Sequence, residues 1–214
     1  MKKFKALLVV ACALLLVAAS VFGTMAYLTS KDTVTNTFTV GKVAIKLDEA
    51  QANLDGSLVA NADRVKANEY KLLPGHTYNK DPMVTVLKDS EPSYVKMTVT
   101  FSKANELDAI FAPDGANLTS IFNGYDSANW IAKGNTKNET TNTRTYEFWY
   151  KEAVGARTAD VALDALFDSI TVPGTITGDQ LKNIEGMTIT VNAYAIQADG
   201  FKSADEAWEA FGKN

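Results

Sequence analysis

Alternation of apolar and polar residues over positions 94–101 constrains the fold more than any other feature of this sequence. The apolar residues of this stretch are Val95, Met97, Val99 and Phe101. The polar residues between them are Lys96, Thr98 and Thr100. A period of two places successive side chains on opposite faces of a β-strand and does not match a helix. The stretch therefore predicts a strand with one buried face and one wet face.

The same period recurs along the chain. Further predicted strands cover residues 38–47, 83–87, 146–151, 170–172 and 188–193, and threonine and aromatic residues are enriched in them. A pleated surface that is wet on one side favours these residue types. The pattern predicts an all-β fold, a jelly-roll-like antiparallel β-sandwich of about seven to nine strands. No linker divides the chain, so residues 27–214 are expected to form a single domain.

A few short helices are expected in the connections and at the C-terminus. Residues 103–111 place apolar side chains on one helical face, and residues 158–167 do the same. The pattern Ser203-Ala-Asp-Glu206 predicts a capping box at the start of a C-terminal helix, which is expected to plug one end of the sandwich through Trp208. Residues 134–145 contain no apolar residue and are expected to form an exposed loop.

The first 26 residues resemble an export signal. Three lysines precede an apolar run from Leu7 to Phe22, and small residues follow it. We expect a peptidase to cut between Ala26 and Tyr27, so that the protein is secreted to the extracellular matrix or cell surface. An uncleaved membrane anchor is the alternative, although the run of about 16 residues is shorter than the roughly 20 that a helix needs to cross a bilayer.

Composition excludes several classes of function. Cleavage would remove three of the 21 Lys and Arg residues and leave 18 against 25 Asp and Glu, without a basic cluster. Nucleic acid is therefore not an expected partner, because binding its backbone needs concentrated positive charge. The one cysteine, Cys12, lies inside the apolar run, so the cleaved chain would have no disulfide and no thiolate metal site.

The residues of common catalytic sites are missing from the sequence. His76 is the only histidine, which excludes an HExxH zinc site, and no GxSxG elbow or phosphate-binding loop occurs. We therefore expect no enzymatic activity, no metal and no cofactor. A glycosidase with paired carboxylates stays open, because two acids can come from any part of a fold.

Four stretches of the chain resemble one known family. Residues 23–32 and 35–41, followed by 73–82 and by 191–200 with Ala207-Trp208, are similar to the TasA–camelysin proteins. These are exported surface and biofilm-matrix proteins of Gram-positive bacteria, processed by a dedicated signal peptidase. The resemblance implies a jelly-roll fold and assembly in which the N-terminal segment of one subunit joins the sheet of the next.

The donor segment implied by this resemblance runs from Tyr27 to Val40. Its apolar residues would insert into the neighbouring subunit, while its threonines would stay wet. These are the candidate donor residues: Tyr27, Val34, Phe38 and Val40. The alternative is that the segment pairs within its own subunit as the first strand.

The leading hypothesis is a secreted, non-enzymatic structural protein whose partners are further copies of itself and components of the cell surface or matrix. The export signal peptidase would be a partner during processing. The alternative is an adhesin for a glycan or a host protein, with Trp149 and Trp130 stacking on sugar faces. A surface protease is less favoured, because the chain lacks a histidine pair.

Overall fold

A computed structural model describes Cys12 and residues 41–111 and 121–212 of the chain. Residue contacts divide the chain into two units, 1–40 and 41–214, and the fold below is that of the second. The predicted cleavage site and the candidate donor residues lie outside the described residues: Ala26, Tyr27, Val34, Phe38 and Val40. Among the described residues, no helix has the length and hydropathy needed to cross a bilayer.

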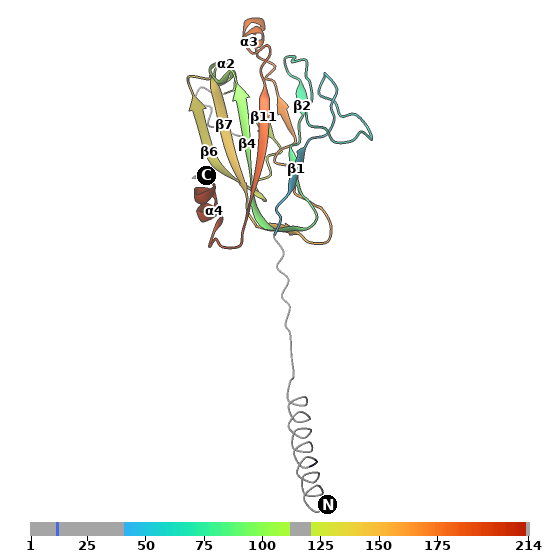
Figure 1. The fold of residues 1–214 in the computed structure, drawn as a ribbon. Helices are drawn as coiled ribbons and strands as arrows, with labels where there is room; N and C mark the ends of the chain where they lie inside the picture. The colour runs from blue at the N-terminus through green and yellow to red at the C-terminus, as the bar shows by residue number, and fades with distance from the viewer. Residues whose placement is uncertain (1–11, 13–40, 112–120, 213–214) are drawn as a thin grey trace, which may run out of the picture. The chain divides into compact units, whose positions relative to one another are not determined.

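One layer of the fold is a large antiparallel sheet (Figure 1). Its order is β11 (Ile189–Gln197), β4 (Ser90–Ser102), β7 (Thr143–Tyr150) and β6 (Trp130–Asn138). The short strand β8 (Val154–Ala156) pairs with the first part of β4, beyond the residues that pair with β7. The edges of this sheet are therefore β11 and β6.

The second layer consists of two short antiparallel sheets. One has the order β1 (Ile45–Asp48), β3 (Met83–Val86) and β9 (Val161–Ala162), and the other β2 (Thr77–Asn79), β10 (Ser169–Thr171) and β5 (Phe122–Asn123). The chain runs from β2 directly into β3 and from β9 towards β10. The backbone N–H of Lys80 donates to the carbonyl of Asp168 (3.0 Å), and that of Leu163 donates to the carbonyl of Val84 (2.8 Å). Between these two bonds, the N–H of Leu166 donates to the carbonyl of Pro82 (3.0 Å), so the pairing continues from one sheet to the other and the two form one layer.

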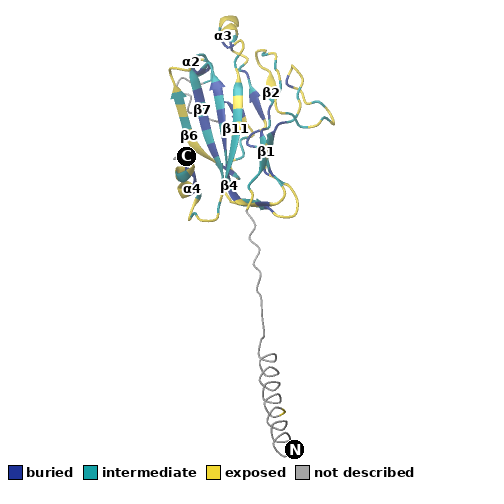
Figure 2. Cartoon of the chain, in the orientation of Figure 1, coloured by how far each residue is buried: buried dark blue, intermediate teal, exposed yellow. Residues whose placement is uncertain are grey.

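The core fills the space between the layers. Val95, Met97 and Val99 on β4 are fully buried, as the alternation predicts. Aromatic rings complete the core, with the ring centroids of Phe122 and Phe167 4.4 Å apart. Figure 2 shows the buried residues concentrated on the inner strands of the large sheet. The prediction of an all-β antiparallel sandwich is confirmed.

The outer face of the large sheet is polar. One row of paired residues crosses every long strand of that sheet with a threonine on each: Thr190, Thr100, Thr145 and Thr136. The hydroxyl groups of Thr100 and Thr145 are 2.8 Å apart and hydrogen-bonded. Because hydroxyls bond both to each other and to water, the part of the face around this row needs no covering layer.

Three short helices accompany the sheets in the described residues: α2 (Ala104–Asp108), α3 (Gly178–Asn183) and α4 (Ala204–Phe211). The predictions near 103–111 and at the C-terminus are confirmed, whereas α3 was not predicted. The Ser203 hydroxyl accepts from the backbone N–H of Glu206, as in a capping box. The Glu206 carboxylate, however, accepts from the N–H of Lys202 and not from that of Ser203.

The position of α4 corrects one expectation. The helix does not plug an end of the sandwich but lies on the outer face of the large sheet, where Trp208 contacts Trp149. The Lys96 ammonium, which projects from that face, lies 4.7 Å from the centroid of the Trp208 ring and 5.3 Å from that of Phe211. Cation–π attraction thus helps hold α4 against the sheet.

Two further predictions are wrong. Residues 158–167 form no helix, because this segment pairs with β3 and buries Leu166 and Phe167 in the core. Residues 134–145 are not a loop but the end of β6, a short turn and the start of β7. An edge strand on a wet face carries few apolar side chains, so the absence of apolar residues misled the prediction.

Candidate binding sites: the β11 edge and an apolar cavity

Among the described residues, one side of β11 leaves its backbone groups without a strand partner over the whole length of the strand. Thr188 accepts a bond from the N–H of Ser102, and Ala198 donates one to Pro92, so these residues direct their backbone groups towards β4. Along a strand, the N–H and C=O groups of successive residues point alternately to one side and to the other. The backbone groups that point away from β4 therefore belong to Ile189, Val191, Ala193, Ala195 and Gln197. Within the described residues no strand pairs with them.

Side chains along this edge are incompletely covered. Val191 and Ala193 face the core, yet both are only partly buried, whereas their β4 partners Val99 and Met97 are completely buried. Strand β1 of the second layer lies beside β11 on this side of the sandwich (Figure 1). A strand added to β11 would bond to the free backbone groups and cover this apolar surface.

The β6 edge is built differently. The register shifts between Ala132 and Gly134, so Lys133 is an extra residue without a partner on β7. Gly134 has a φ of 117°, which only glycine adopts easily. Lysines and bulges are devices that block strand addition, and β6 has a bulge and two lysines, Lys133 and Lys137.

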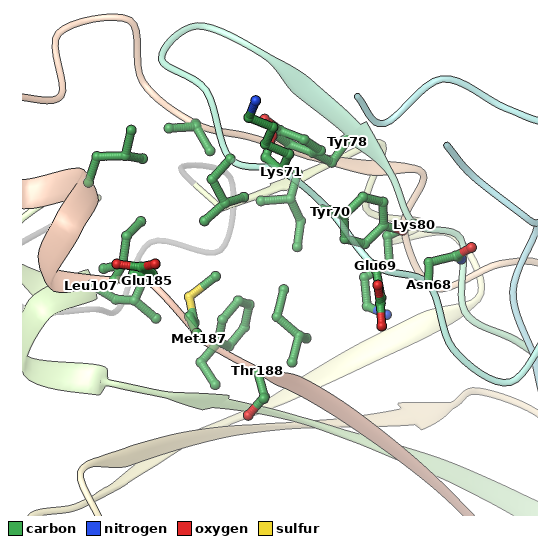
Figure 3. Close-up of a pocket in the computed structure, with 18 of the residues that line it drawn as sticks. Asn68, Glu69, Tyr70, Lys71, Tyr78, Lys80, Leu107, Glu185, Met187 and Thr188 are labelled. Atoms are coloured by element: carbon green, nitrogen blue, oxygen red, sulfur yellow. The ribbon is translucent and has the colours of Figure 1, made fainter. Parts of the chain in front are cut away.

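A cavity of about 900 Å³ opens near α3, at the end of the sandwich where β11 begins. Its walls come from the segment before β2 and from β2, β4, α2, β10, α3 and the start of β11. Figure 3 shows Tyr70 and Tyr78 on one wall and Leu107 and Met187 on the opposite one. Most of the lining surface is hydrocarbon or aromatic ring, so the cavity is suited to an apolar ligand.

Polar groups in these walls are already used within the protein. The Tyr70 hydroxyl donates to the carbonyl of Asn79 (2.6 Å), and the Tyr78 hydroxyl donates to the carbonyl of Lys71 (2.8 Å). Burial, with a smaller contribution from the charge of Glu49, raises the pKa of Tyr70 well above its ordinary value, so its phenol stays protonated. The two tyrosines therefore line the cavity with hydroxyl groups that are already bonded within the protein.

Charged side chains are found at the rim. Glu69 and Lys71 lie before β2, while Lys182 and Glu185 lie on and after α3, and all four residues are exposed. The rim therefore carries two charges of each sign around an apolar interior.

Ion pairs hold the segment that forms one wall of the cavity. The Arg64 guanidinium donates to the carboxylates of Asp48 (2.6 Å) and Asp81 (2.7 Å), and the Lys80 ammonium donates to Glu49 (2.5 Å). Burial by itself raises the pKa of Asp48, but hydrogen bonds from Lys46 and Arg64 outweigh it and hold this pKa below the ordinary value. The charged form of Asp48 therefore stabilises the fold.

The two tryptophans proposed for sugar stacking are both engaged in packing. Trp130 is only 1% exposed, and its indole N–H donates to the carbonyl of Asp164 (3.0 Å), so it is unavailable to a ligand. Trp149 lies on the outer face, where the Lys133 ammonium is 3.9 Å from its ring centroid and Trp208 packs beside it. The bulge at Lys133 brings this cation over the ring. A sugar would have to displace Lys133 to reach Trp149.

His76 is exposed in the turn before β2. In the part of the chain that the structure describes, no group of three His, Cys, Asp or Glu residues could hold a metal ion. Sequence reasoning missed the cavity because its walls come from many segments. One signal was present, since Thr177 and Gln180 form a complete capping box that begins α3.

No protein-family model, curated protein or solved structure matches this chain.

Proposed function

We propose that the protein is an exported, non-enzymatic structural protein of the cell surface or biofilm matrix, which assembles by adding a β-strand to the β11 edge. The observation that carries this proposal is β11 itself. This strand has no charged residue, proline, glycine or bulge, and it borders core side chains that are only partly buried. An edge of this kind is a template for pairing with another chain.

The donor is residues 27–40 of a second copy. In this segment Val34, Phe38 and Val40 alternate with threonines, a pattern that matches an edge with one apolar side. Fully extended, the segment spans about 45 Å, whereas β11 spans about 30 Å, so it is long enough to cover the whole edge. The resemblance of residues 23–32 and 35–41 to TasA–camelysin proteins supports the same arrangement, as does the export signal.

The test compares two chains, residues 27–214 and residues 41–214. Both retain the core of the described residues, whose buried and partly buried members lie at or beyond Ile45. Sedimentation velocity over a range of concentrations, with electron microscopy, should show assemblies of the longer chain and monomers of the shorter one. A synthetic peptide of residues 27–40 should bind the shorter chain.

Two outcomes would contradict the proposal. If both chains stay monomeric at every concentration and pH, the segment does not drive assembly and pairs within its own subunit or not at all. If both chains assemble equally, the contact lies elsewhere on the domain.

A further inference from the structure

We propose that the cavity beside α3 binds the hydrocarbon tail of a single-chain amphiphile, such as a fatty acid or the acyl chain of a lipid, while the head group stays at the rim. This inference is independent of the proposed assembly, because it rests on the cavity and not on the β11 backbone groups. The size of the cavity, about 900 Å³, falls in the range of small-molecule sites.

The chemistry of the walls favours hydrocarbon. Phe101, Leu107, Ile170 and Leu181 contribute carbon surface from different elements, and the two tyrosines also line the cavity. A flexible acyl chain can follow such an irregular apolar space without requiring a polar partner. The free energy of binding would come from removing the methylene groups from water.

The same walls disfavour a peptide. Each peptide unit brings an N–H and a C=O group, and burying either without a partner costs free energy. The polar side chains of the wall that could serve as partners are already bonded within the protein. The Tyr78 hydroxyl donates to the carbonyl of Lys71, and the Lys80 ammonium donates to the Glu49 carboxylate. The Asn68 amide donates to the Glu49 carboxylate and to the carbonyl of Ala50. A hydrocarbon tail meets no such cost.

The rim suits a head group that remains in water. Lys71 and Lys182 can approach a carboxylate or phosphate, while Glu69 and Glu185 can approach a choline or ammonium group. Because both signs are present, the rim does not select the head group by charge. The length of the tail therefore determines the affinity.

The first measurement is a series of fatty acids of increasing length, from hexanoate to dodecanoate, bound to residues 27–214 below their micelle concentrations. Isothermal titration or equilibrium dialysis should show affinity rising about fourfold for each added methylene until the cavity is full. Dodecanoyl-lysophosphatidylcholine should bind about as tightly as dodecanoate if the tail dominates. If one of the two ligands binds more tightly, it indicates whether the natural ligand is a lipid or a free fatty acid, and either result supports the proposal. No dependence on chain length would overturn it.

The second measurement uses a matched pair of variants. Leu181→Glu puts a carboxylate in the cavity wall and should weaken dodecanoate binding at least tenfold. Leu58→Glu makes the same change at a leucine that is 55% exposed and outside the cavity lining, and should leave binding unchanged. Equal losses in both variants would show non-specific adhesion and overturn the proposal.

Leu181→Glu could fail to fold, which circular dichroism would detect. A third variant keeps the proposal testable in that case. Met187→Trp fills part of the cavity with apolar volume and should shorten the longest tail that still gains affinity. Unchanged binding in this folded variant would place the ligand elsewhere and overturn the proposal. The proposal would also fail if the peptide of residues 27–40 binds and dodecanoate does not, a result that leaves strand assembly intact.

Discussion

The two edges of the large sheet differ in how they meet solvent. Strand β6 carries a bulge and two lysines, and one of these, Lys133, crosses onto Trp149 and pairs with Asp205 of α4. Strand β11 carries no charged residue and no irregularity, and it borders the cavity. Within the described residues no strand pairs with the outer side of either edge, but the outward groups of Trp130 on β6 already bond to Asp126 and Tyr125. Only β6 has the features that prevent strand addition.

This difference gives the proposed assembly a direction. A sheet with two open edges could add strands on both sides, whereas a sheet with one protected edge adds them on one side only. The side of β11 also includes β1 and the ion pairs around Arg64, so it combines apolar surface with buried charge. Each prediction below tests one part of this contrast.

The largest effect is expected from proline at the two edges. In Ala193→Pro the ring replaces an outward N–H of β11, so the strand of the proposed assembly would lose a hydrogen bond and meet the ring. We expect the association constant of residues 27–214 to fall at least about tenfold, a change of about 1.4 kcal/mol. Sedimentation velocity measures this constant.

The comparison variant is Ala132→Pro, beside the bulge of β6, where the backbone is already hydrogen-bonded to the Tyr125 side chain. It should leave association within a factor of two or three of the parent. If the control abolishes association and Ala193→Pro does not, the roles of the two edges are reversed.

The next effect concerns the ion pairs beside β1. Arg64→Ala leaves Asp48 and Asp81 without their guanidinium partner, and the Asp48 side chain is only 2% exposed. Breaking such a pair should lower the free energy of unfolding by about 3 kcal/mol, measured by urea denaturation. Lys46→Ala removes a half-exposed partner of the same carboxylate and should cost less than about 1 kcal/mol. Equal costs would show that burial of this network contributes little.

Stability should also depend on pH through Asp48. Its pKa in the folded protein is below the ordinary value, so its contribution is complete above about pH 4 and is lost as the pH falls through the lowered pKa. Urea midpoints measured from pH 7 to pH 2 should fall more steeply for the parent than for Asp48→Asn. Identical slopes would assign the acid sensitivity to other carboxyl groups.

A smaller effect is expected at the bulge of β6. Gly134→Val forces a β-branched residue to a φ of 117°, although an added Cβ meets no atom within 4 Å. The cost is therefore conformational, about 2 kcal/mol, and thermal melting should detect it. Thr136→Val, on the same strand but away from the bulge, should be close to neutral. A neutral Gly134→Val would mean that the bulge relaxes without cost.

The sequence predicted strands best where one face is buried and the other wet. Strand β4 is the clearest case, because Val95, Met97 and Val99 are all completely buried. Strand β6 was missed because its pairing with β7 depends on backbone bonds that side-chain hydrophobicity does not report. The segment 158–167 was assigned to a helix because local spacing cannot reveal that β3 offers an edge to pair with.

Prediction of the sites was weaker for a similar reason. The edge status of β11 depends on strand order, and the cavity depends on packing between Tyr70 and Met187, which are far apart in the sequence. Trp149 was correctly placed on a strand, but its exposure depends on α4 and on the bulge at Lys133. Residue type alone did not show that Trp130 is in the core.

The threonine row from Thr190 to Thr136 has a consequence for the dimensions of any assembly. A broad face of hydroxyl groups keeps its water more readily than an aliphatic one, so copies gain little by stacking flat against each other. Growth confined to a rim, with hydrated flanks, yields slender filaments and not laterally thickened bundles.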